Sequence, residues 1–459
     1  MSAQISQSQK EIPMIVFISD LHFRDEKEWT VSLRATKGFI EQNLIPQIRD
    51  AKAKEVTIVF LGDIVDINRS PFWIDGHSGI YKPWSHWQAT LREKKLGNVS
   101  PDQPFEHDDF EKHILKVLDQ IEETNRGNYR LWRRFKKLDK RMWGDEHMPD
   151  KITFEFVPGN HDRLSQYSPA TQSRLIKHLC LDQDATSVFP WVKYDEPHNV
   201  LALHGHVFTG TDFGGRSHQP DEFDSSPWYM LPSLGDVATL MFGVKLYHDI
   251  KGHEHLRDLL AEIDLVRPEG EIFRWILSKV KGNPEDEKRI DTIVARLARE
   301  FVKDPFVRWR LKWWEMLLAR LILFLGLPKN ITRAGWLFRL LGFGRESKEK
   351  YTKEMLKMIT KGKFREWLDR RYGDQQPNIV SGHTHHPLVV PVQGDKEGDP
   401  SAAVHYFNTG TWLDTIEKDC ATGYARRHQI THATFYKDGE EVKRDGKRSY
   451  WEYWDGCLK

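Results

Sequence analysis

The chain has few cysteines and no long apolar run. Its 459 residues include three cysteines, Cys180, Cys420 and Cys457, and none has Cys-x-x-Cys spacing. This scatter argues against a disulfide framework or a thiolate metal site and is typical of a reducing compartment, so we expect a cytoplasmic protein. The most apolar segment, residues 316–327, contains Arg320, whereas a spanning helix needs roughly 20 apolar residues. We therefore predict no transmembrane segment.

An excess of charge of one sign is also missing. Lys and Arg total 68 and Asp and Glu total 67, so the composition gives no signal for nucleic acid or for an anionic membrane. Any contact with nucleic acid or an anionic membrane has to be made by a local cluster of basic residues. Residues 1–12 are polar and lack the apolar core of a signal peptide. The sequence contains no internal repeat and no low-complexity tract.

The most informative segment is 156–163, which reads Phe-Val-Pro-Gly-Asn-His-Asp-Arg. The apolar run 152–157 predicts a strand, and the Pro-Gly pair that follows ends this strand sharply. Asn160, His161 and Asp162 are thereby placed together at the carboxyl end of the strand. Open α/β sheets bind their ligands at this end.

Four other polar clusters follow strand-like runs. They are Asp20-Leu21-His22, Gly62-Asp63-Ile64-Val65-Asp66, His204-Gly205-His206 and Gly382-His383-Thr384-His385. The preceding runs are 14–19, 56–61, 199–203 and 378–381. A helical pattern over 29–49 separates the first two runs, and a strand, helix, strand unit of this length predicts a parallel pair.

In order, the five clusters resemble the pattern of the calcineurin-like metallophosphoesterases: Asp-x-His, Gly-Asp-x-x-Asp, Gly-Asn-His-Asp/Glu, His, and Gly-His-x-His. The resemblance spans residues 20–385. It implies an α/β fold, a four-layer αββα sandwich of two mixed β-sheets, with a core formed by residues 1–210 and 376–459. The alternation of strands and helices agrees with this fold but would not distinguish it from a doubly wound sheet.

The resemblance also implies a hydrolase of phosphomonoesters or phosphodiesters that uses two divalent metal ions. The family pattern assigns Asp20, His22, Asp63 and His385 to the first ion, and Asp63, Asn160, His204 and His383 to the second. The shared Asp63 would hold the ions about 3.5 to 4 Å apart, with a bridging hydroxide as the attacking group. A nitrogen and oxygen ligand set without cysteine suits Mn²⁺, Fe or Zn²⁺ more than Ca²⁺, and we expect Mn²⁺.

Two further residues receive catalytic roles by the same resemblance. His161 is expected to protonate the departing oxygen as the general acid, and Asp66 is expected to hold its imidazole in position. We expect Asp162 to make a local hydrogen bond in the turn instead of binding metal.

Three residues are candidates for binding the substrate. Arg163 and Arg216 follow ligand clusters, and a guanidinium offers a planar fork for a phosphate oxygen. His206 is separated from His204 by one glycine, so either histidine could face the second metal. We rank His204 first as the ligand because it directly ends the strand.

Two insertions interrupt the core. Residues 67–107 are long, irregular and rich in aromatic residues, and we predict an active-site loop that forms one wall of the substrate site. A loop packed over an edge of the core is the alternative. Residues 211–375 are predominantly helical and are expected to form a cap. Within this cap we predict a helix that starts at Asn283-Pro284 and another that holds residues 307–325.

The segment 307–343 is apolar and aromatic with interspersed arginines, and it has two interpretations. Its helices either bury their apolar faces against each other and the core, or meet an acyl chain or a bilayer surface as a peripheral membrane contact. We favour ordinary packing, because an apolar stripe is more often core. The basic pattern over 131–142 presents a similar choice, and we favour a solvated helix face over a phosphate grip.

The last strands are expected to complete the second sheet. Residues 404–408 predict one strand, and 431–436 with 441–443 predict a closing hairpin around Asp438-Gly439.

Departures from sister families narrow the substrate. Phosphoprotein phosphatases extend the second motif to Gly-Asp-x-Val-Asp-Arg-Gly and have glutamate where Asp162 stands, so protein dephosphorylation loses support. Enzymes resembling the UDP-diacylglucosamine pyrophosphatase share a helical insertion but have arginine in place of His161.

The alternative function is a pyrophosphatase or phosphodiesterase acting on a lipid-linked or nucleotide substrate. A metal-free scaffold on the same fold is a third interpretation. Such a scaffold would lack some of the ligand residues of the family pattern, and this sequence has all of them.

Overall fold

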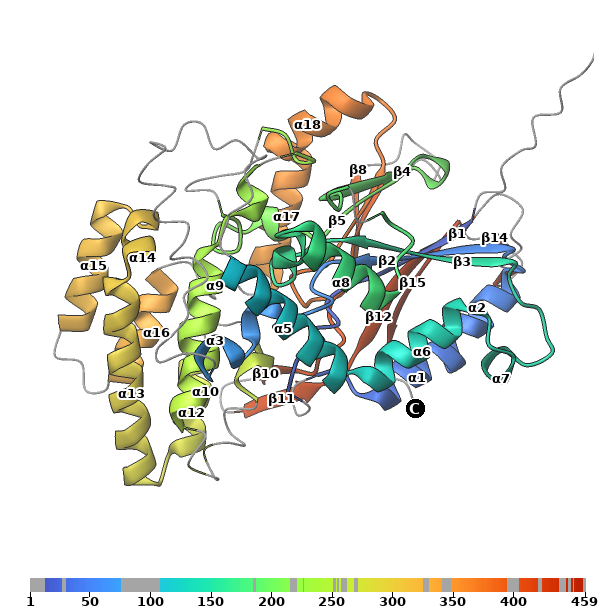
Figure 1. Cartoon of the computed structure of the whole chain (residues 1–459). Coiled ribbons are helices and arrows are strands. Elements are labelled where there is room, and N and C mark those ends of the chain that lie inside the picture. Colours follow the sequence, from blue (N-terminus) through green and yellow to red (C-terminus); the bar gives the residue numbers. More distant parts are fainter. Residues whose placement is uncertain are drawn as a thin grey trace, which may run out of the picture.

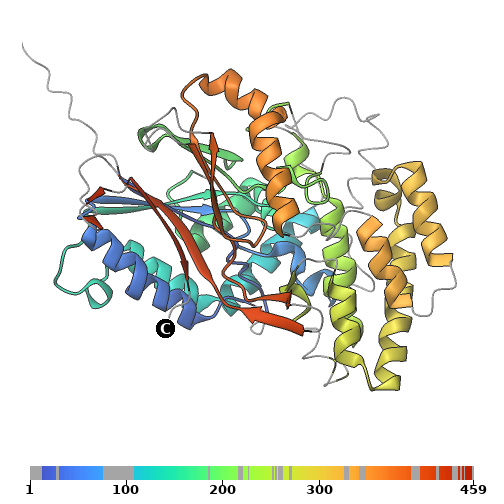
Figure 2. The same cartoon turned by 180° about the vertical axis from the view of Figure 1, so that it is seen from behind.

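The chain is an α/β structure with two five-stranded mixed sheets, which confirms the predicted class (Figures 1 and 2). The computed structural model describes residues 13–26, 30–75, 108–184, 187–214, 221–225, 227–250, 253, 256, 262–267, 271–324, 330–340, 348–393, 404–419, 423–436, 443–444, 447–448 and 450–456. Most of the predicted 67–107 loop and Arg216 lie outside these residues.

The first sheet has the strand order β15-β12-β1-β2-β3. Its strands are β1 (Met14–Ile18), β2 (Glu55–Leu61), β3 (Lys151–Val157), β12 (Ile430–Phe435) and β15 (Trp451–Gly456). β1, β2 and β3 are parallel, as predicted for the first two, whereas β12 and β15 run antiparallel to their neighbours. Side chains of β1 alternate between two buried clusters, with Val16 on one face and Phe17 on the other.

The second sheet has the order β4-β5-β7-β9-β8. Its strands are β4 (Val192–Asp195), β5 (Val200–Leu203), β7 (Asn378–Ser381), β8 (Leu388–Gln393) and β9 (Val404–Asn408), and β5, β7 and β9 are parallel. The two sheets face each other. Phe17 and Val59 of the first sheet share one buried cluster with Ala202, Val380 and Phe407 of the second.

Helices cover the outer face of each sheet. On the first sheet these are α1 (Leu33–Gly38), a π-helical turn (Phe39–Leu44), α2 (Ile45–Asp50), α5 (Asp108–Thr124), α6 (Arg126–Lys136), α7 (Lys140–Trp143) and α8 (Pro169–Leu179). Phe60 of β2 packs edge-on against Trp132 of α6 at 5.4 Å between ring centroids. On the second sheet, Phe364 of α18 (Lys363–Tyr372) and Met355 of α17 (Lys348–Lys361) share a cluster with Tyr406 of β9.

The 211–375 insertion is mostly helical, as expected. Besides α17 and α18 it contains α9 (Leu234–Ala238), α10 (Lys245–Ile250), α12 (Ile272–Val280), α13 (Pro284–Lys303), α14 (Pro305–Arg310), α15 (Trp313–Phe324) and α16 (Asn330–Leu340). α13 begins where predicted, since the side chain of Asn283 accepts a hydrogen bond from the backbone N–H of Asp286. A short strand of the insertion, β6 (Val266–Arg267), pairs with β10 (Thr415–Asp419), which also pairs with β11 (Gly423–Arg427).

Three predictions about chain organisation are wrong. The helix expected over 307–325 is two helices, because Leu311 is extended and the carboxylate of Glu315 caps the N–H of Lys312 at the start of α15. The closing hairpin of 431–436 is not seen: β12 pairs with β1 and β15, residues 443–444 pair with 447–448, and the predicted turn at Asp438-Gly439 lies outside the described residues. The late strands are also divided, since β12 and β15 join the first sheet while β8 and β9 join the second.

The helices that the structure describes contain no stretch long and apolar enough to cross a bilayer. This agrees with the expectation of no transmembrane segment in that part of the chain.

Candidate metal centre

The five predicted clusters all follow parallel strands, β1, β2, β3, β5 and β7, and they meet at one edge of the two sheets. Backbone hydrogen bonds join the loops across this edge. The N–H of Asp20 donates to the carbonyl of Gly62 at 3.0 Å, and the N–H of Gly382 donates to the carbonyl of His204 at 3.0 Å. Each of these bonds joins two loops of the same sheet, and the N–H of His383 donates to Oδ2 of Asp20 at 2.9 Å, which fixes the loops of the two sheets against one another.

The backbone at this edge is unusual. Among described residues, nine non-glycine residues have positive φ, and five of them are predicted ligands: Asp20, His22, Asp63, His383 and His385. Such conformations cost energy and persist where the surroundings enforce them, often at functional sites. Gly159 shows how closely the loops approach, because a Cβ at this position would collide with the carboxylate of Asp63. The fold holds these side chains in a strained but defined arrangement.

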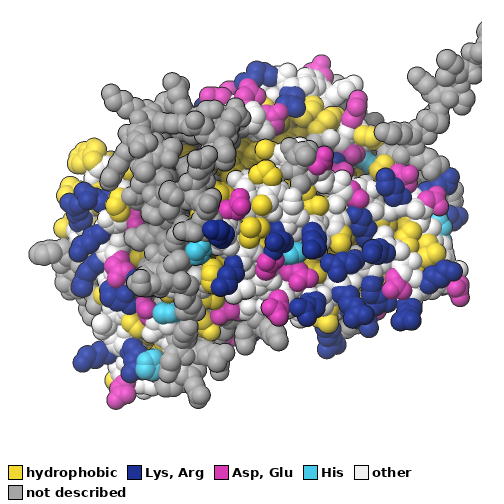
Figure 3. Space-filling model, in the orientation of Figure 1, with side chains coloured by type: hydrophobic (Ala, Val, Ile, Leu, Met, Phe, Trp, Pro, Cys, Tyr) yellow, Lys and Arg dark blue, Asp and Glu magenta, His cyan; other side chains and the backbone are white. Residues whose placement is uncertain are grey.

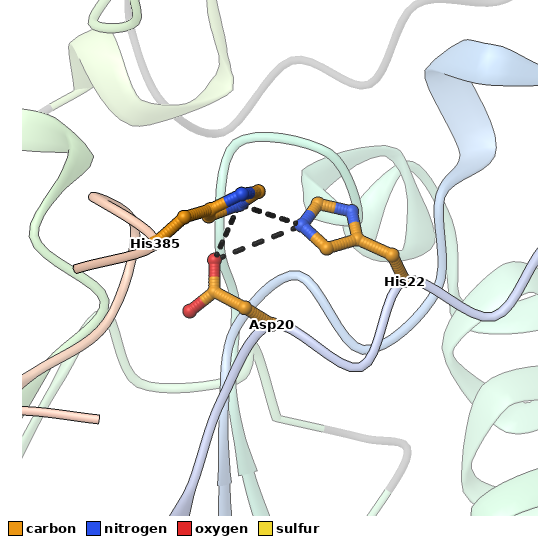
Figure 4. Close-up of side chains that lie close together, drawn as sticks. All are labelled: Asp20, His22 and His385. Carbon is orange, nitrogen blue, oxygen red and sulfur yellow. Dashed lines mark hydrogen bonds and ion pairs between the residues drawn. The ribbon is translucent and has the colours of Figure 1, made fainter. Parts of the chain in front are cut away.

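The first group of ligands comprises Asp20, His22 and His385 (Figure 4). Oδ1 of Asp20 lies 3.3 Å from Nε2 of His385 and 3.7 Å from Nε2 of His22. The two Nε2 atoms are 3.0 Å apart. All three side chains are buried, and their ligand atoms converge on one point.

The second group comprises Asp63, His204 and His383. Nε2 of His204 lies 3.1 Å from Oδ2 of Asp63, and Nδ1 of His204 is 2.9 Å from the carbonyl oxygen of Leu61. Since a carbonyl only accepts, Nδ1 carries a proton, and Nε2 is the nitrogen that faces the site. Nε2 of His383 is 2.9 Å from Oγ1 of Thr209, which orients that imidazole.

Asp63 lies between the two groups. Its Oδ2 is 3.1 Å from Nε2 of His204 in the second group and 4.0 Å from Nε2 of His22 in the first. Its Oδ1 accepts the backbone N–H of His161 at 2.9 Å. One carboxylate oxygen thus faces both sets of imidazoles, which is the position that a bridging ligand requires.

Three ligand atoms are buried without a hydrogen-bond partner: Oδ1 of Asp20, Oδ1 of Asn160 and Nε2 of His204. Leaving such an atom unsatisfied costs roughly 1–3 kcal/mol. Each belongs to a predicted ligand, and a carboxylate oxygen, an amide oxygen and an imidazole nitrogen are all suitable donors for a divalent cation. The residues present therefore fit a pair of such cations.

The carboxylates of the site are held ionised. Burial opposes the charge on Asp20, but the nearby imidazoles of His22 and His385 lower the pKa of its carboxyl far below the usual range. Burial likewise opposes the charge on Asp63, and the nearby imidazoles of His204 and His161 lower its pKa. The site therefore concentrates negative charge in a dry environment.

The histidines respond to these carboxylates in opposite ways. Burial disfavours charge on His204, but Asp63 outweighs this effect and raises the pKa of the imidazole to about 10. His385 is different: burial and then the neighbouring guanidinium of Arg267 lower the pKa of its imidazole well below the usual value. Protons and divalent cations compete for the same ligand atoms, so cation binding here must release protons.

His161 and Asp66 form the predicted pair. Nδ1 of His161 is 2.6 Å from Oδ1 of Asp66, and this contact confirms the expected geometry. Burial works against protonation, but Asp66 and then Asp63 raise the pKa of the imidazole to about 9. Nε2 of His161 points toward Asp63, at 4.0 Å from Oδ2, and the side chain is one-fifth exposed. Its Nε2 therefore faces the candidate ligands while the side chain keeps some exposure to solvent.

Hydrogen bonds around the first group fix the tautomers. Asp66 is ionised and only accepts, so Nδ1 of His22, 3.3 Å from its Oδ2, carries a proton. Arg267 donates to Nδ1 of His385 at 2.7 Å, so the proton of that neutral ring lies on Nε2. The Nε2 proton of His385 therefore lies in the 3.0 Å contact with Nε2 of His22, and ligation of a cation by Nε2 of His385 requires its departure.

The remaining predicted residues have mixed outcomes. Asp162 makes the expected turn hydrogen bond, accepting the N–H of Gly159 at 2.6 Å. Arg163 is not free for a phosphate, because it is buried, pairs with the carboxylate of Asp236 and donates to the carbonyl of Asn160 at 3.0 Å. His206 is buried beside aromatic rings rather than lining an open surface.

Sequence reasoning missed several residues of the site. Arg24 donates to Oδ2 of Asp66 at 2.9 Å, and Oδ2 of Asp212 lies 3.4 Å from Nε2 of His383. Arg267 reaches His385 from β6 of the insertion. Arg24 lies two residues after His22, and this proximity was the one available signal. Nothing local in the sequence points to Asp212 or Arg267.

No protein-family model matches the chain, and no curated protein matches it. The function is therefore inferred from the geometry of the site and from the motifs that form it.

Proposed function

We propose that this chain is a calcineurin-like metallophosphoesterase that hydrolyses phosphomonoester or phosphodiester bonds with two divalent cations. The position of Asp63 carries the proposal. One oxygen of its carboxylate lies within 4.0 Å of imidazole nitrogens from both ligand groups. The layers support the same reading, because two facing mixed sheets, with helices on both outer faces, bring five loops to one edge. We interpret this arrangement as the four-layer αββα sandwich.

In this proposal, Asp20, His22, Asp63 and His385 would hold one cation, and Asp63, Asn160, His204 and His383 the other. Such cations supply Lewis acidity toward the phosphoryl oxygens and activate water for in-line attack. Buried side chains exclude bulk water and keep the carboxylates ionised. The strained loops hold these ligands in place before substrate binds.

His161 acts as the general acid. Its Nδ1 is held by Asp66, which orients the ring, and Nε2 faces the ligand groups at 4.0 Å from Oδ2 of Asp63. Because Asp66 and Asp63 raise the pKa of this imidazole, His161 keeps its proton at neutral pH. It can then donate that proton to the leaving oxygen of a phosphate ester.

Hydrolysis of para-nitrophenyl phosphate and bis-para-nitrophenyl phosphate tests the proposal. The full chain is treated with chelator, reloaded with Mn²⁺ and compared with Asp63→Asn and His161→Asn. We expect Mn²⁺-dependent turnover that both substitutions abolish, and the preferred ester identifies a monoesterase or a diesterase. An absence of bound Mn²⁺ in the reloaded protein would overturn the proposal in favour of a metal-free scaffold.

A pyrophosphatase or phosphodiesterase with a lipid-linked or nucleotide substrate is the second candidate. One observation favours it: the helical insertion contributes Arg267 to the site, so this part of the chain helps to shape the space above the ligands. Two bound cations without turnover of either nitrophenyl ester, but with release of phosphate from diphosphate esters, would select this candidate.

A further inference from the structure

The outer end of the helical insertion exposes an unusual amount of apolar surface. Among the described residues, ten large apolar side chains are strongly exposed, and six of them lie on α15 and α16: Trp313, Trp314, Leu317, Leu318, Leu321 and Trp336. Trp313 is 79 % exposed, Leu317 60 % and Trp336 59 %. A tryptophan side chain has about 200 Å² of accessible surface, so the exposed fractions of the three tryptophans correspond to roughly 350 Å² of exposed surface.

The exposed side chains of α15 form one continuous arc. At 100° per residue, Trp313, Leu317, Leu321, Trp314 and Leu318 follow one another over about 140° of the helix circumference. The opposite side of the helix carries Ala319, which is fully buried where α15 packs on α13 and α16. Met316 and Ile322 flank Ala319 and pack against the core, so α15 is anchored on this side and presents the five large apolar side chains of the arc outward. Ordinary packing, the favoured interpretation of 307–343, therefore holds for part of the segment, such as Val307 and Leu337, but not for the exposed arc of α15.

Basic residues border this arc. Residues 305–321 contain four bases and one acid, although the whole chain is nearly neutral. Arg308, Lys312 and Arg320 are exposed, and Arg320 lies beside Trp313 on the helical projection. Hydrophobic and basic side chains also lie next to each other at the left edge of the face shown in Figure 3. The local excess of positive charge is complementary to an anionic surface.

The position of α15 leaves the arc accessible. In both Figure 1 and Figure 2, α15 lies at the outermost edge of the molecule, beyond α13 and on the far side of the insertion from the sheets. A flat partner can therefore approach it without contacting the core. Tryptophan and leucine on one face of a helix, bordered by bases, is the composition of helices that lie in a membrane interface.

We propose that α15, together with Trp336 of α16, docks the protein on an anionic lipid bilayer. The indole rings and leucines enter the boundary between headgroups and acyl chains, and the exposed bases contact lipid phosphates. This surface contains none of the metal-site residues, so the inference stands independently of the proposed activity.

Flotation of the full chain with vesicles tests the inference. We expect the protein to float with vesicles of phosphatidylcholine and phosphatidylserine and to float less with phosphatidylcholine alone. Trp313→Glu combined with Leu317→Glu should lower the partition coefficient at least about tenfold, because two apolar anchors are lost. Lys312→Glu combined with Arg320→Glu should weaken binding to anionic vesicles, and this difference should shrink at high salt.

Val188→Glu is the matched control. Val188 is 66 % exposed and lies between α8 and β4, away from the proposed surface, so the variant adds a charge without altering docking. The Trp313→Glu/Leu317→Glu, Lys312→Glu/Arg320→Glu and Val188→Glu proteins should all keep the thermal stability of the wild type, since the altered side chains are exposed. Wild-type protein that does not float, or a Trp313→Glu/Leu317→Glu variant that floats like wild type, would overturn the inference. A concentration-dependent dimer that this variant dissociates, without flotation of the wild type, would replace the bilayer by a second copy of the chain.

Discussion

The metal centre and the α15 surface depart from ordinary burial in opposite ways. At the edge of the sheets, charged and polar atoms are buried, and Oδ1 of Asp20 and Oδ1 of Asn160 have no hydrogen-bond partner. On α15, large apolar side chains such as Trp313 and Leu317 are exposed. Both arrangements cost stability, since unsatisfied buried polar atoms and hydrated apolar surface are each unfavourable.

The difference lies in how firmly each region is held. The metal centre is fixed from several sides, by hydrogen bonds within and between the loops of the two sheets and by ligands in strained conformations. α15 rests on its neighbours through one side, formed by Met316, Ala319 and Ile322. A cation site needs ligand atoms placed within fractions of an ångström, whereas a lipid surface adapts to the shape of its partner. The two regions therefore suit two kinds of partner from outside the chain.

The largest expected effect belongs to Asp63. Asp63→Asn removes a carboxylate that faces both groups, so we expect loss of at least one Mn²⁺ in equilibrium dialysis. Turnover by the variant should fall about 10³-fold or more, because the transition state loses several kcal/mol of stabilisation by the bound cations. In wild type, Mn²⁺ at about 100 times its Kd should stabilise the fold by roughly 2.7 kcal/mol, and this increase in melting temperature should disappear in the variant.

Asp221→Asn provides the control, because Asp221 is an exposed aspartate paired with Lys363 on the helical insertion. It should leave Mn²⁺ binding, melting temperature and turnover unchanged. If wild type and Asp63→Asn bind the same number of Mn²⁺ ions, the proposed bridging role of Asp63 is wrong. The proposal for the α15 surface would not be affected by this result.

The second prediction concerns His161. A general acid matters most when the leaving group is poor, so His161→Asn should reduce hydrolysis of an alkyl phosphate by about 10²-fold or more. It should reduce hydrolysis of para-nitrophenyl phosphate less, because nitrophenolate leaves without full protonation. Mn²⁺ binding should be retained, since His161 is not a predicted ligand. An equal loss for both esters would contradict a role in protonating the leaving group.

The third prediction separates burial from contact with carboxylates. His432 of β12 is fully buried like the site histidines, but burial alone is the cause that lowers the pKa of its imidazole to about 3. The unfolded chain binds this proton near pH 6.5, so His432 contributes stability that is complete above pH 6.5 and lost as the pH falls below it. Between pH 6.5 and 5 the loss should be about 2 kcal/mol.

Urea unfolding at the two pH values measures this effect. His432→Gln should unfold more easily at both values, because the ring packs against Trp454 and Phe39. Its stability should, however, fall about 2 kcal/mol less than that of wild type on acidification. Identical pH dependence in both proteins would show that burial at this position does not control protonation.

The sequence predicts the grouping of the candidate ligands better than it predicts the fold around them. The ligand clusters are visible because each is local: a short apolar run, then a carboxylate or imidazole, as in Asp20 and His22. The helix start at Asn283 is visible for the same reason. Such signals depend on residues a few positions apart, and the structure places them as expected.

Long-range pairings escape this reasoning. The Asp438-Gly439 pair suggests a tight hairpin, but β12 pairs with β15 because Trp451 and Tyr453 of that strand pack against the cluster between the sheets. Arg267 is 118 residues from His385, and only the pairing of β6 with β10 brings this part of the insertion to the site. The exposure of α15 is equally invisible, because its composition suits a buried helix as well as a membrane surface.

The smallest expected effect tests the link between the insertion and the metal centre. Arg267 donates to Nδ1 of His385, whereas ligation through Nε2 leaves the ring proton on Nδ1, so the two interactions require opposite tautomers. Arg267→Ala should therefore tighten Mn²⁺ binding a few-fold. If the guanidinium then contacts a phosphate oxygen, the same variant should raise KM by about tenfold with kcat little changed. Arg267→Lys keeps the charge but not the planar fork of the guanidinium. Its KM should therefore lie between the KM of Arg267→Ala and that of the wild type. Unchanged KM and Mn²⁺ affinity in Arg267→Ala would separate the insertion from the chemistry and leave membrane docking as its remaining proposed role.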